Sequence, residues 1–386
     1  MTTHDKLGTT RRRFITTAAA GLAAASASGL AASSAGGSEP PAAGSGLADA
    51  VLEAFKTHRL VGLGEIHDLQ NHCDALALLL SDPRLPGVVD DIVLEFGNAL
   101  YQHTVDKFIA GQPVADADLR RVWRNTTQSP LETWDEPMYE QVYRTVRAAN
   151  WALPPHKRMR VLLGDPPIDW ARVTNFSEYR FWERQHGPVF WAPLVEKQVL
   201  AKGRRALLSF GLDTFTGVNA TVAGERIYRI VDLVPPAGDL GGLATRLSRY
   251  PRYSVIPAAN AWLGSVDAGL AFDAPGTPGP GLRKAPPRRR GRIGKRPILS
   301  IGNDFCGQRI GSLIDAGLYL GQPGEVTASL PDPAIYVDPV YWKELERRKT
   351  IWGVSLDLDW WRQEHPQANV NWWRAPTCSE KRPGTD

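Results

Sequence analysis

A glutamate and a histidine stand two residues apart, directly after an apolar run that predicts a buried strand. The run covers residues 60–63, and the turn Gly64-Glu65-Ile66-His67 follows it. If the backbone stays extended there, both side chains point to the same side. A carboxylate so placed can orient an imidazole as a general base near neutral pH, and the pair can also bind a divalent metal ion. A structural histidine beside a helix-capping glutamate is the alternative interpretation.

Three further carboxylates, Glu95, Asp165 and Asp213, each come one to three residues after an apolar run. In a parallel sheet the carboxyl ends of such strands meet at one edge, where ligands bind. Burial of several carboxylates together is costly unless they are paired, metal-bound or solvated. We therefore predict a site at this edge, with His67, Glu65 and Glu95 as its catalytic residues. If a divalent metal ion takes part, its predicted ligands are Glu65, His67, Glu95, Asp165 and Asp213.

Three polar residues are candidates for substrate binding: His72, Asn98 and Arg124. His72 lies five residues after His67, at the predicted start of a helix. An exposed histidine at a helix start is the alternative interpretation of His72. The spacing of Asn98 and Arg124 does not decide where their side chains lie.

The elements that must position these residues follow an alternating pattern from residue 47 onward. Short apolar runs, typical of buried strands, alternate with longer amphipathic stretches, typical of helices. This pattern predicts an α/β fold with a mostly parallel central sheet, flanked by helices, and with the site at the carboxyl ends of the strands. The later runs 227–233, 298–301 and 318–320 predict additional strands, and Asp232 has a similar place in the first of them.

We expect one α/β domain over residues 47–350, because no interdomain linker interrupts the pattern. Residues 273–297 are rich in Pro, Gly and Arg and predict a solvated loop, with contact to an anionic polymer as the alternative. Residues 351–386 form a tryptophan-rich tail, which we expect to pack on the domain or on a partner.

The N-terminus is typical of a twin-arginine signal peptide, which we assign to residues 1–35. Arg11, Arg12 and Arg13 precede Phe14-Ile15, and a weakly apolar Ala/Gly-rich stretch follows. Residues 36–46 then form a flexible tether. We expect the twin-arginine export machinery as a partner, a location in the periplasm or outside the cell, and no stable membrane span in the mature chain.

Composition and missing motifs exclude several classes of protein. Of the 45 basic and 41 acidic residues, only four basic and one acidic lie in residues 1–35, so the mature chain is nearly neutral. Eight basic residues lie between Arg283 and Arg296, which argues against a nucleic-acid surface spread over the domain. The chain has no dinucleotide-binding glycine motif, no P-loop and no Gly-x-Ser-x-Gly turn.

At the Gly-Glu-x-His turn the chain resembles the superfamily that joins ChaN-like haem-uptake proteins, erythromycin-esterase-like hydrolases and Tiki-type metalloproteases. The first half of the sequence carries most of the likeness. The matching segments are residues 61–67, 92–98 and 105–111, and later residues 318–321 through 331–333.

This resemblance implies an α/β sheet with its site at the carboxyl edge. In esterase-like members the turn histidine acts as a base toward water, with nearby glutamates essential; in Tiki-like members the corresponding elements serve metal-dependent hydrolysis. The matching positions are His67, Glu65 and Glu95. Many members place a second histidine after the strand that corresponds to residues 206–210. This chain has Gly211-Leu212-Asp213 there, which argues against a two-histidine mechanism.

Two functions remain. The first is an exported hydrolase that activates water to cleave an ester, lactone or amide bond of a small molecule, with or without a divalent metal ion. The alternative is a non-enzymatic uptake protein of the cell envelope that binds haem or iron. A carboxylate-rich edge favours the hydrolase, since tight haem ligation uses His, Met or Cys side chains that are scarce near this site.

Overall fold

The computed structural model describes residues 45–129, 134–216, 220–235, 242–263, 309–322, 324–329, 335 and 337–353. The predicted signal peptide, the tether up to residue 44, the basic segment 273–297, the apolar run 298–301, the segment 331–333 and the tail beyond residue 353 lie outside these residues. No helix in the described ranges has the length and apolar character needed to cross a membrane.

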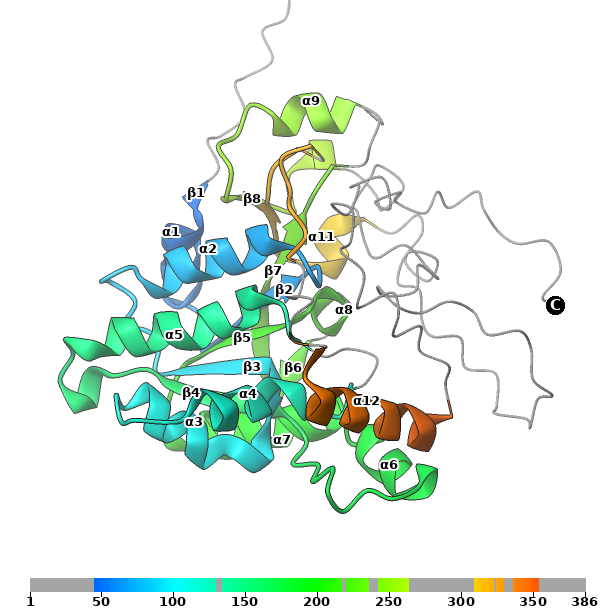
Figure 1. The fold of residues 1–386 in the computed structure, drawn as a ribbon. Helices are drawn as coiled ribbons and strands as arrows, with labels where there is room; N and C mark the ends of the chain where they lie inside the picture. The colour runs from blue at the N-terminus through cyan, green and yellow to red at the C-terminus, as the bar shows by residue number, and fades with distance from the viewer. Residues whose placement is uncertain are drawn as a thin grey trace, which may run out of the picture. The chain divides into compact units, whose positions relative to one another are not determined.

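A central sheet runs through the described part of the chain, and most of its neighbouring strands are parallel (Figure 1). The strand order is β1-β8-β9-β7-β2-β5-β3-β4, with β6 paired to β7. Antiparallel pairing is confined to β1 with β8, β8 with β9, and β6 with β7. The strands are β1 Ser45–Gly46, β2 Leu60–Glu65, β3 Asp91–Asn98, β4 Arg160–Asp165, β5 Ala206–Gly211, β6 Thr221–Val222, β7 Glu225–Leu233, β8 Ser254–Pro257 and β9 Ala316–Tyr319.

Glu65 and Asp165 are the last residues of β2 and β4, whereas Glu95, which was expected to follow its strand, lies inside β3 because this strand continues past an irregularity to Asn98. The strand β2 lies between β5 and β7 and is parallel to both, so that Glu65 pairs with Gly211 and Gly64 pairs with Val231. On its other side β5 pairs with β3, which in turn pairs with β4. The carboxyl ends of five parallel strands, β7, β2, β5, β3 and β4, therefore meet along one edge.

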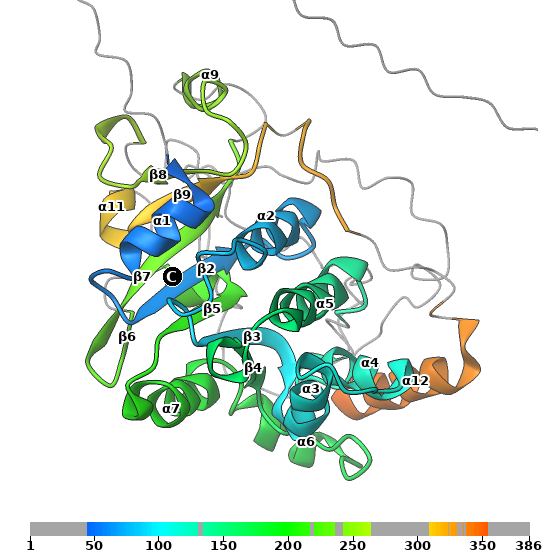
Figure 2. The same ribbon diagram turned by 90° about the vertical axis from the view of Figure 1, so that its left-hand side faces the viewer.

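Helices cover both faces of this sheet. The helices α2 and α5 pack against one another on one face, and α7 lies on the other (Figure 2). The described helices are α1 Leu47–Ala54, α2 Gln70–Leu80, α3 Gln102–Ile109, α4 Asp116–Arg124, α5 Pro137–Trp151, α6 Phe176–Glu183, α7 Pro188–Gln198, α8 Leu212–Phe215, α9 Leu243–Leu247, α11 Ile310–Leu313 and α12 Pro339–Trp352.

Helix boundaries follow local chemistry. The helix α5 begins with Pro137, whose missing N–H is no loss at the first helical position. In α12 the side chain of Asp338 caps the helix by accepting from the N–H of Val340, and Gly353 ends it at a φ of 74°. Asp82-Pro83 follows soon after α2 ends at Leu80.

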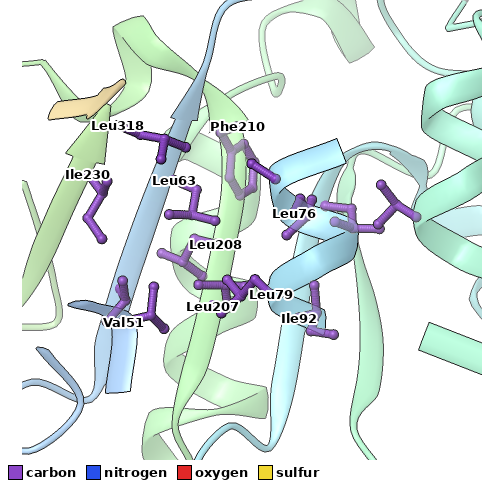
Figure 3. Close-up of a cluster of buried hydrophobic side chains, with 14 of the residues drawn as sticks. Val51, Leu63, Leu76, Leu79, Ile92, Leu207, Leu208, Phe210, Ile230 and Leu318 are labelled. Atoms are coloured by element: carbon purple, nitrogen blue, oxygen red, sulfur yellow. The ribbon is translucent and has the colours of Figure 1, made fainter. Parts of the chain in front are cut away.

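The core lies between the sheet and its helices. All six residues of β2 and of β5 are buried, as expected for parallel strands that are covered on both faces. Figure 3 shows how Leu76 and Leu79 of α2 lie among strand residues such as Leu207 and Ile92. A Cβ on Gly62 would lie 2.7 Å from the ring of Phe215, so this glycine allows α8 to approach β2 closely.

The predicted fold class is confirmed: the structure is α/β, with a mostly parallel sheet between layers of helices. The predicted strand at 227–233 is part of β7, and the run 318–320 overlaps β9.

Candidate functional site

The strand β2 delivers the Glu65–His67 pair. Glu65 is its last residue and is buried. Its Oε1 lies 2.6 Å from Nδ1 of His67. Since an ionised carboxylate only accepts hydrogen bonds, Nδ1 donates and the lone pair of the neutral imidazole lies on Nε2. The side chain of His67 is 26% exposed, so the pair joins a buried carboxylate to an imidazole that solvent can reach.

Strained backbone surrounds His67. Asp68 follows it with a φ of 64°, and Trp134, whose ring lies edge-on to the imidazole at 5.0 Å, has a φ of 52°. Residues with a Cβ rarely adopt this left-handed conformation, which costs about 1–3 kcal/mol and concentrates at functional sites. The rest of the fold must therefore offset this conformational free energy in order to hold Asp68 and Trp134 beside His67.

A second histidine lies behind Glu65. His72, in the first turn of α2, is buried, and its Nδ1 lies 2.9 Å from Oδ1 of Asp232 on β7. Its Nε2 faces Oε2 of Glu65 at 3.7 Å. The other Asp232 oxygen accepts from the N–H of Ile66 at 2.8 Å. These contacts form a row of four ionisable groups, Asp232, His72, Glu65 and His67, that leads from the core to the accessible imidazole.

Charges along this row determine its protonation. Burial alone would raise the pKa of Glu65, but the hydrogen bond from His67 and the charges of both histidines lower it below its ordinary value. Burial would lower the pKa of His72, but the Asp232 carboxylate outweighs burial and raises it. The raised pKa favours the charged form of the buried imidazole, which in turn stabilises the ionised form of Glu65.

A second group of ionisable side chains is assembled around Glu95. Its Oε2 accepts from the N–H of Gly211 at 2.6 Å, and its Oε1 lies 3.6 Å from Nε2 of His186. The other ring nitrogen of His186 lies 3.2 Å from Oδ1 of Asp165. Thr127 holds Asp165 from its backbone N–H, at 2.8 Å, and from its hydroxyl.

The pKa directions in this group favour a charged His186. Burial raises the pKa of Glu95, and the nearby Asp213 carboxylate adds to that rise. Burial also raises the pKa of Asp165, although the hydrogen bond from His186 opposes it. For His186 itself burial lowers the pKa, but Asp165 and Glu95 outweigh this and raise it above 6.5. The imidazolium form is therefore favoured beside two buried carboxyl groups.

Gly211 is the point where the two groups meet. It pairs with Glu65 in the sheet and donates to Glu95. A Cβ on residue 211 would lie 2.8 Å from Nε2 of His67 and 3.0 Å from Oδ1 of Asp213. Only a glycine gives His67 this space, so β5 ends in the residue that the site requires.

The structure thus brings together Glu65, His67, Glu95, Asp165 and Asp213, and it adds His186. The sequence argued against a second histidine because none follows β5. The second imidazole instead comes from the connection between α6 and α7. No strand end or motif marks this position; the one indirect signal was the buried Asp165, which needed a partner.

The three residues predicted for substrate binding have other partners. His72 is buried against Asp232. The amide of Asn98 donates to the carbonyls of Asn125 and Ile168, at 2.6 and 2.8 Å. Arg124 donates to Asp135 at 2.6 Å. These contacts give His72 a place in the row behind Glu65, and they tie the other two residues to loops that border the site.

Several oxygens of the predicted metal ligands accept hydrogen bonds in the structure. Oε1 of Glu65 accepts from His67 and, at 3.3 Å, from the hydroxyl of Tyr139. Both oxygens of Asp165 accept from Thr127. Within the described ranges no three His, Cys, Asp or Glu side chains are arranged to hold a metal ion. A metal ion held by these residues therefore stays a prediction.

Two cavities of about 390 Å³ lie elsewhere in the described structure. One borders the start of β4 and includes Arg160 and Gln198. The other lies beyond the end of β4, among Leu100, Phe181 and Trp182. Neither cavity is lined by His67 or His186. We therefore locate the candidate site from the cluster of ionisable side chains.

The raised pKa values of His72 and His186 predict how stability varies with pH. Both groups bind protons more tightly in the folded chain than at the ordinary value of 6.5. Their contribution is complete below about pH 6.5 and is lost as the pH rises through the folded-state values, by up to about 1.4 kcal/mol per pH unit for each histidine.

Urea denaturation at about pH 6.5, 7.5 and 8.5 tests this dependence. The free energy of unfolding should fall across the series in the wild type and fall less steeply in His72→Gln. A free energy that stays constant or rises over this range contradicts the assignment.

Comparisons with known proteins extend only to solved structures. No protein-family model matches the sequence, and no curated protein does. A structure of the type III effector HopBA1 is similar, with a TM-score of 0.34 and 13% identity over 52% of this chain and 87% of that one. A structure of ChaN of Campylobacter jejuni, described as showing cofacial heme binding, has a TM-score of 0.32 and 12% identity over 49% of this chain and 86% of that one.

Proposed function

We propose that this protein is a hydrolase of ester, lactone or amide bonds in a small molecule, with His67 as the base that activates water. One observation carries the proposal: the buried carboxylate of Glu65 lies 2.6 Å from Nδ1 of an accessible imidazole at the carboxyl edge of a parallel sheet. This contact fixes the tautomer and stabilises the imidazolium that forms when Nε2 takes a proton.

The proposed reaction uses water, the substrate and His67, and no cofactor takes part in it. Nε2 of His67 removes a proton from water while the water oxygen attacks the carbonyl carbon. The tetrahedral intermediate collapses with cleavage of the bond to the leaving oxygen or nitrogen, which takes the proton back from His67. The products are a carboxylic acid and an alcohol or amine. Glu65 stays ionised throughout, since its lowered pKa resists protonation.

The Glu95 group supplies a positive charge to the proposed site. His186 is held by Asp165 and Thr127, and its raised pKa favours the imidazolium form. A positive charge fixed in this way stabilises the negative charge that develops on a carbonyl oxygen in the transition state. Glu95 contacts Nε2 of His186 through one carboxyl oxygen and the N–H of Gly211 through the other. We assign it the role of fixing the position of His186 relative to Gly211, which lies against His67.

Haem is the alternative ligand, and the surroundings of His67 fit it poorly. An imidazole that ligates haem iron needs space for the porphyrin around its coordinating nitrogen. Nε2 of His67 lies against Gly211, so closely that an added Cβ would approach it to 2.8 Å. We therefore assign this nitrogen to a reactant as small as water.

We further propose that the protein is exported, on the basis of Arg11 and Arg12 ahead of Phe14-Ile15. If the twin-arginine machinery recognises the signal, Arg11→Lys/Arg12→Lys should retain the full-length precursor in the cytoplasm. Fractionation of cells that express wild-type and variant chains, with immunoblotting, measures this directly. Arg283→Lys, outside the signal, serves as the control. Equal export of the double variant and the wild type would overturn the assignment.

The hydrolase proposal is tested on purified mature protein with a panel of chromogenic esters, lactones and anilides. We expect cleavage of at least one bond class by the wild type and its loss in His67→Ala. The same preparations are titrated with haemin and followed by absorbance. A haemin spectrum that changes on binding to the wild type and is lost in His67→Ala, with no bond cleaved, would replace the hydrolase with a haem-binding protein.

A further inference from the structure

Residues 125–129 and 134–136, which we call the wall segment, border the site. Three of their side chains each contact one reacting group. These contacts are Thr127 with Asp165, Gln128 with Glu95, and Trp134 with His67. Thr127 also lies 3.2 Å from Nδ1 of His186, so the position of the wall segment affects the base, the second histidine and the carboxyl groups of Asp165 and Glu95.

The helix α12, some 200 residues further along the chain, holds one end of the wall segment through Arg348. This arginine is buried, with a side chain only 3% exposed. Its Nη1 donates to the carbonyl of Arg124 at 2.8 Å and to Oγ of Ser129 at 2.9 Å. Its Nη2 donates to Oδ1 of Asn125 at 2.6 Å. Glu344, one helical turn earlier, accepts from Nε at 2.7 Å and balances the charge.

The same helix holds the other end through Tyr341. The hydroxyl of Tyr341 donates to Oδ2 of Asp135 at 2.7 Å, and Arg124 donates to Oδ1 of the same carboxylate at 2.6 Å. The Arg124 guanidinium lies 4.2 Å from the centre of the Tyr341 ring. Asp135 directly follows Trp134, so this cluster fixes the residue that packs against His67.

Two further hydrogen bonds hold the middle of the wall segment. Nε1 of Trp170 donates to the carbonyl of Thr126 at 3.0 Å, and the Tyr179 hydroxyl donates to the carbonyl of Thr127 at 3.2 Å. The Arg348 guanidinium lies 4.7 Å from the centre of the Trp170 ring. Arg348 therefore supports the wall segment both directly and through Trp170.

We propose that α12 sets the position of the wall segment, with Arg348 and Tyr341 as positioning residues for the chemistry at His67 and His186. This inference rests on the proposed function for its effect on catalysis, but the hold on the wall segment is independent of any substrate. The contacts described above run from both residues to the wall segment, so each acts on the site through that segment.

Charge-assisted hydrogen bonds of a buried arginine are strong, and their loss leaves several buried polar atoms without a donor. Without Arg348 the wall segment should become mobile around Ser129 and Thr127. Because catalysis needs the reacting groups held to within about 0.5 Å, a looser wall slows the chemical step more than it weakens substrate binding.

The test compares four variants of the mature protein by hydrogen–deuterium exchange and by steady-state kinetics. Arg348→Met removes the guanidinium group and its hydrogen bonds but keeps an apolar side chain of similar length. Arg348→Lys keeps a positive charge but has a single nitrogen to donate from. Tyr341→Phe removes one hydrogen bond and keeps the ring. Lys343→Met, on the exposed side of α12, is the matched control. Melting curves show whether each variant is folded.

In peptides that cover residues 123–129, we expect exchange to be faster than in the wild type in Arg348→Met. The increase should be smaller in Arg348→Lys, and Lys343→Met should exchange at the wild-type rate. Tyr341→Phe should speed exchange around residues 134–136 and, since it removes a single bond, stay folded. For a substrate that the wild type hydrolyses, kcat should fall about 10-fold or more in Arg348→Met with little change in KM. Arg348→Lys should have a kcat between those of Arg348→Met and the wild type.

Unchanged exchange in both stretches of the wall segment in folded Arg348→Met and Tyr341→Phe overturns the proposal. So does an increase spread evenly over the whole chain, because it would show a general loss of stability. If the wild type cleaves no bond in the panel, the hydrolase fails, while the exchange result still decides whether α12 holds the wall.

Discussion

His67→Ala should lower kcat/KM for the best substrate of the panel by about 100-fold or more, because a positioned general base contributes about that much. The imidazole is partly exposed, and its removal leaves a small gap beside Gly211 and Trp134. We therefore expect the variant to stay folded, with a melting temperature close to that of the wild type.

His103→Ala is the matched control, since His103 lies exposed on α3. The control should keep wild-type kinetics. If His67→Ala and His103→Ala have the same kcat/KM, His67 is not the base.

Glu65→Gln should also lower kcat/KM by about 100-fold or more, although it keeps the shape of the side chain. The amide can donate to Nδ1 of His67, which would move the proton of the neutral imidazole to Nε2 and block its action as a base. It would also leave His72, whose raised pKa favours its charged form, opposite a neutral group at 3.7 Å. The effect should appear in kcat, because Glu65 is buried and acts on the reaction through His67.

Glu53→Gln is the control for this substitution, since Glu53 is an exposed residue that pairs with Lys56 in a surface contact. The two variants, assayed at several pH values, should differ at every pH. Activity of Glu65→Gln within about threefold of the control would show that the carboxylate does not orient the base.

The sequence predicted the strand ends at Glu65 and Asp165 and the parallel arrangement that brings them near Glu95. An apolar run followed by Glu65 and His67 has few interpretations once parallel neighbours supply Glu95 and Asp165. The sheet register then brings Glu65 beside Gly211, as a parallel arrangement requires. Local patterns determined these positions, because each depends on a strand and the turn directly after it.

The contacts that could not be predicted from the sequence join separate segments of the chain. His186 reaches Asp165 from a loop 21 residues later, and His72 meets Asp232 across 160 residues. Arg124 had the chemistry of a substrate-binding residue, yet its charge is matched to Asp135 and covered by α12. Side-chain pairing at such separations depends on tertiary packing, which hydrophobic periodicity does not report.

The central claim, that Glu65 makes His67 a base, is tested most directly by a nitrogen-15 NMR titration of the histidine side chains, with His67→Ala used to assign the His67 signals. The account predicts that neutral His67 carries its proton on Nδ1, that Glu65→Gln moves that proton to Nε2, and that the midpoint of the His67 titration coincides with the acid limb of kcat/KM. Neutral His67 protonated on Nε2 in the wild type, or a midpoint more than about one pH unit from that limb, would contradict it.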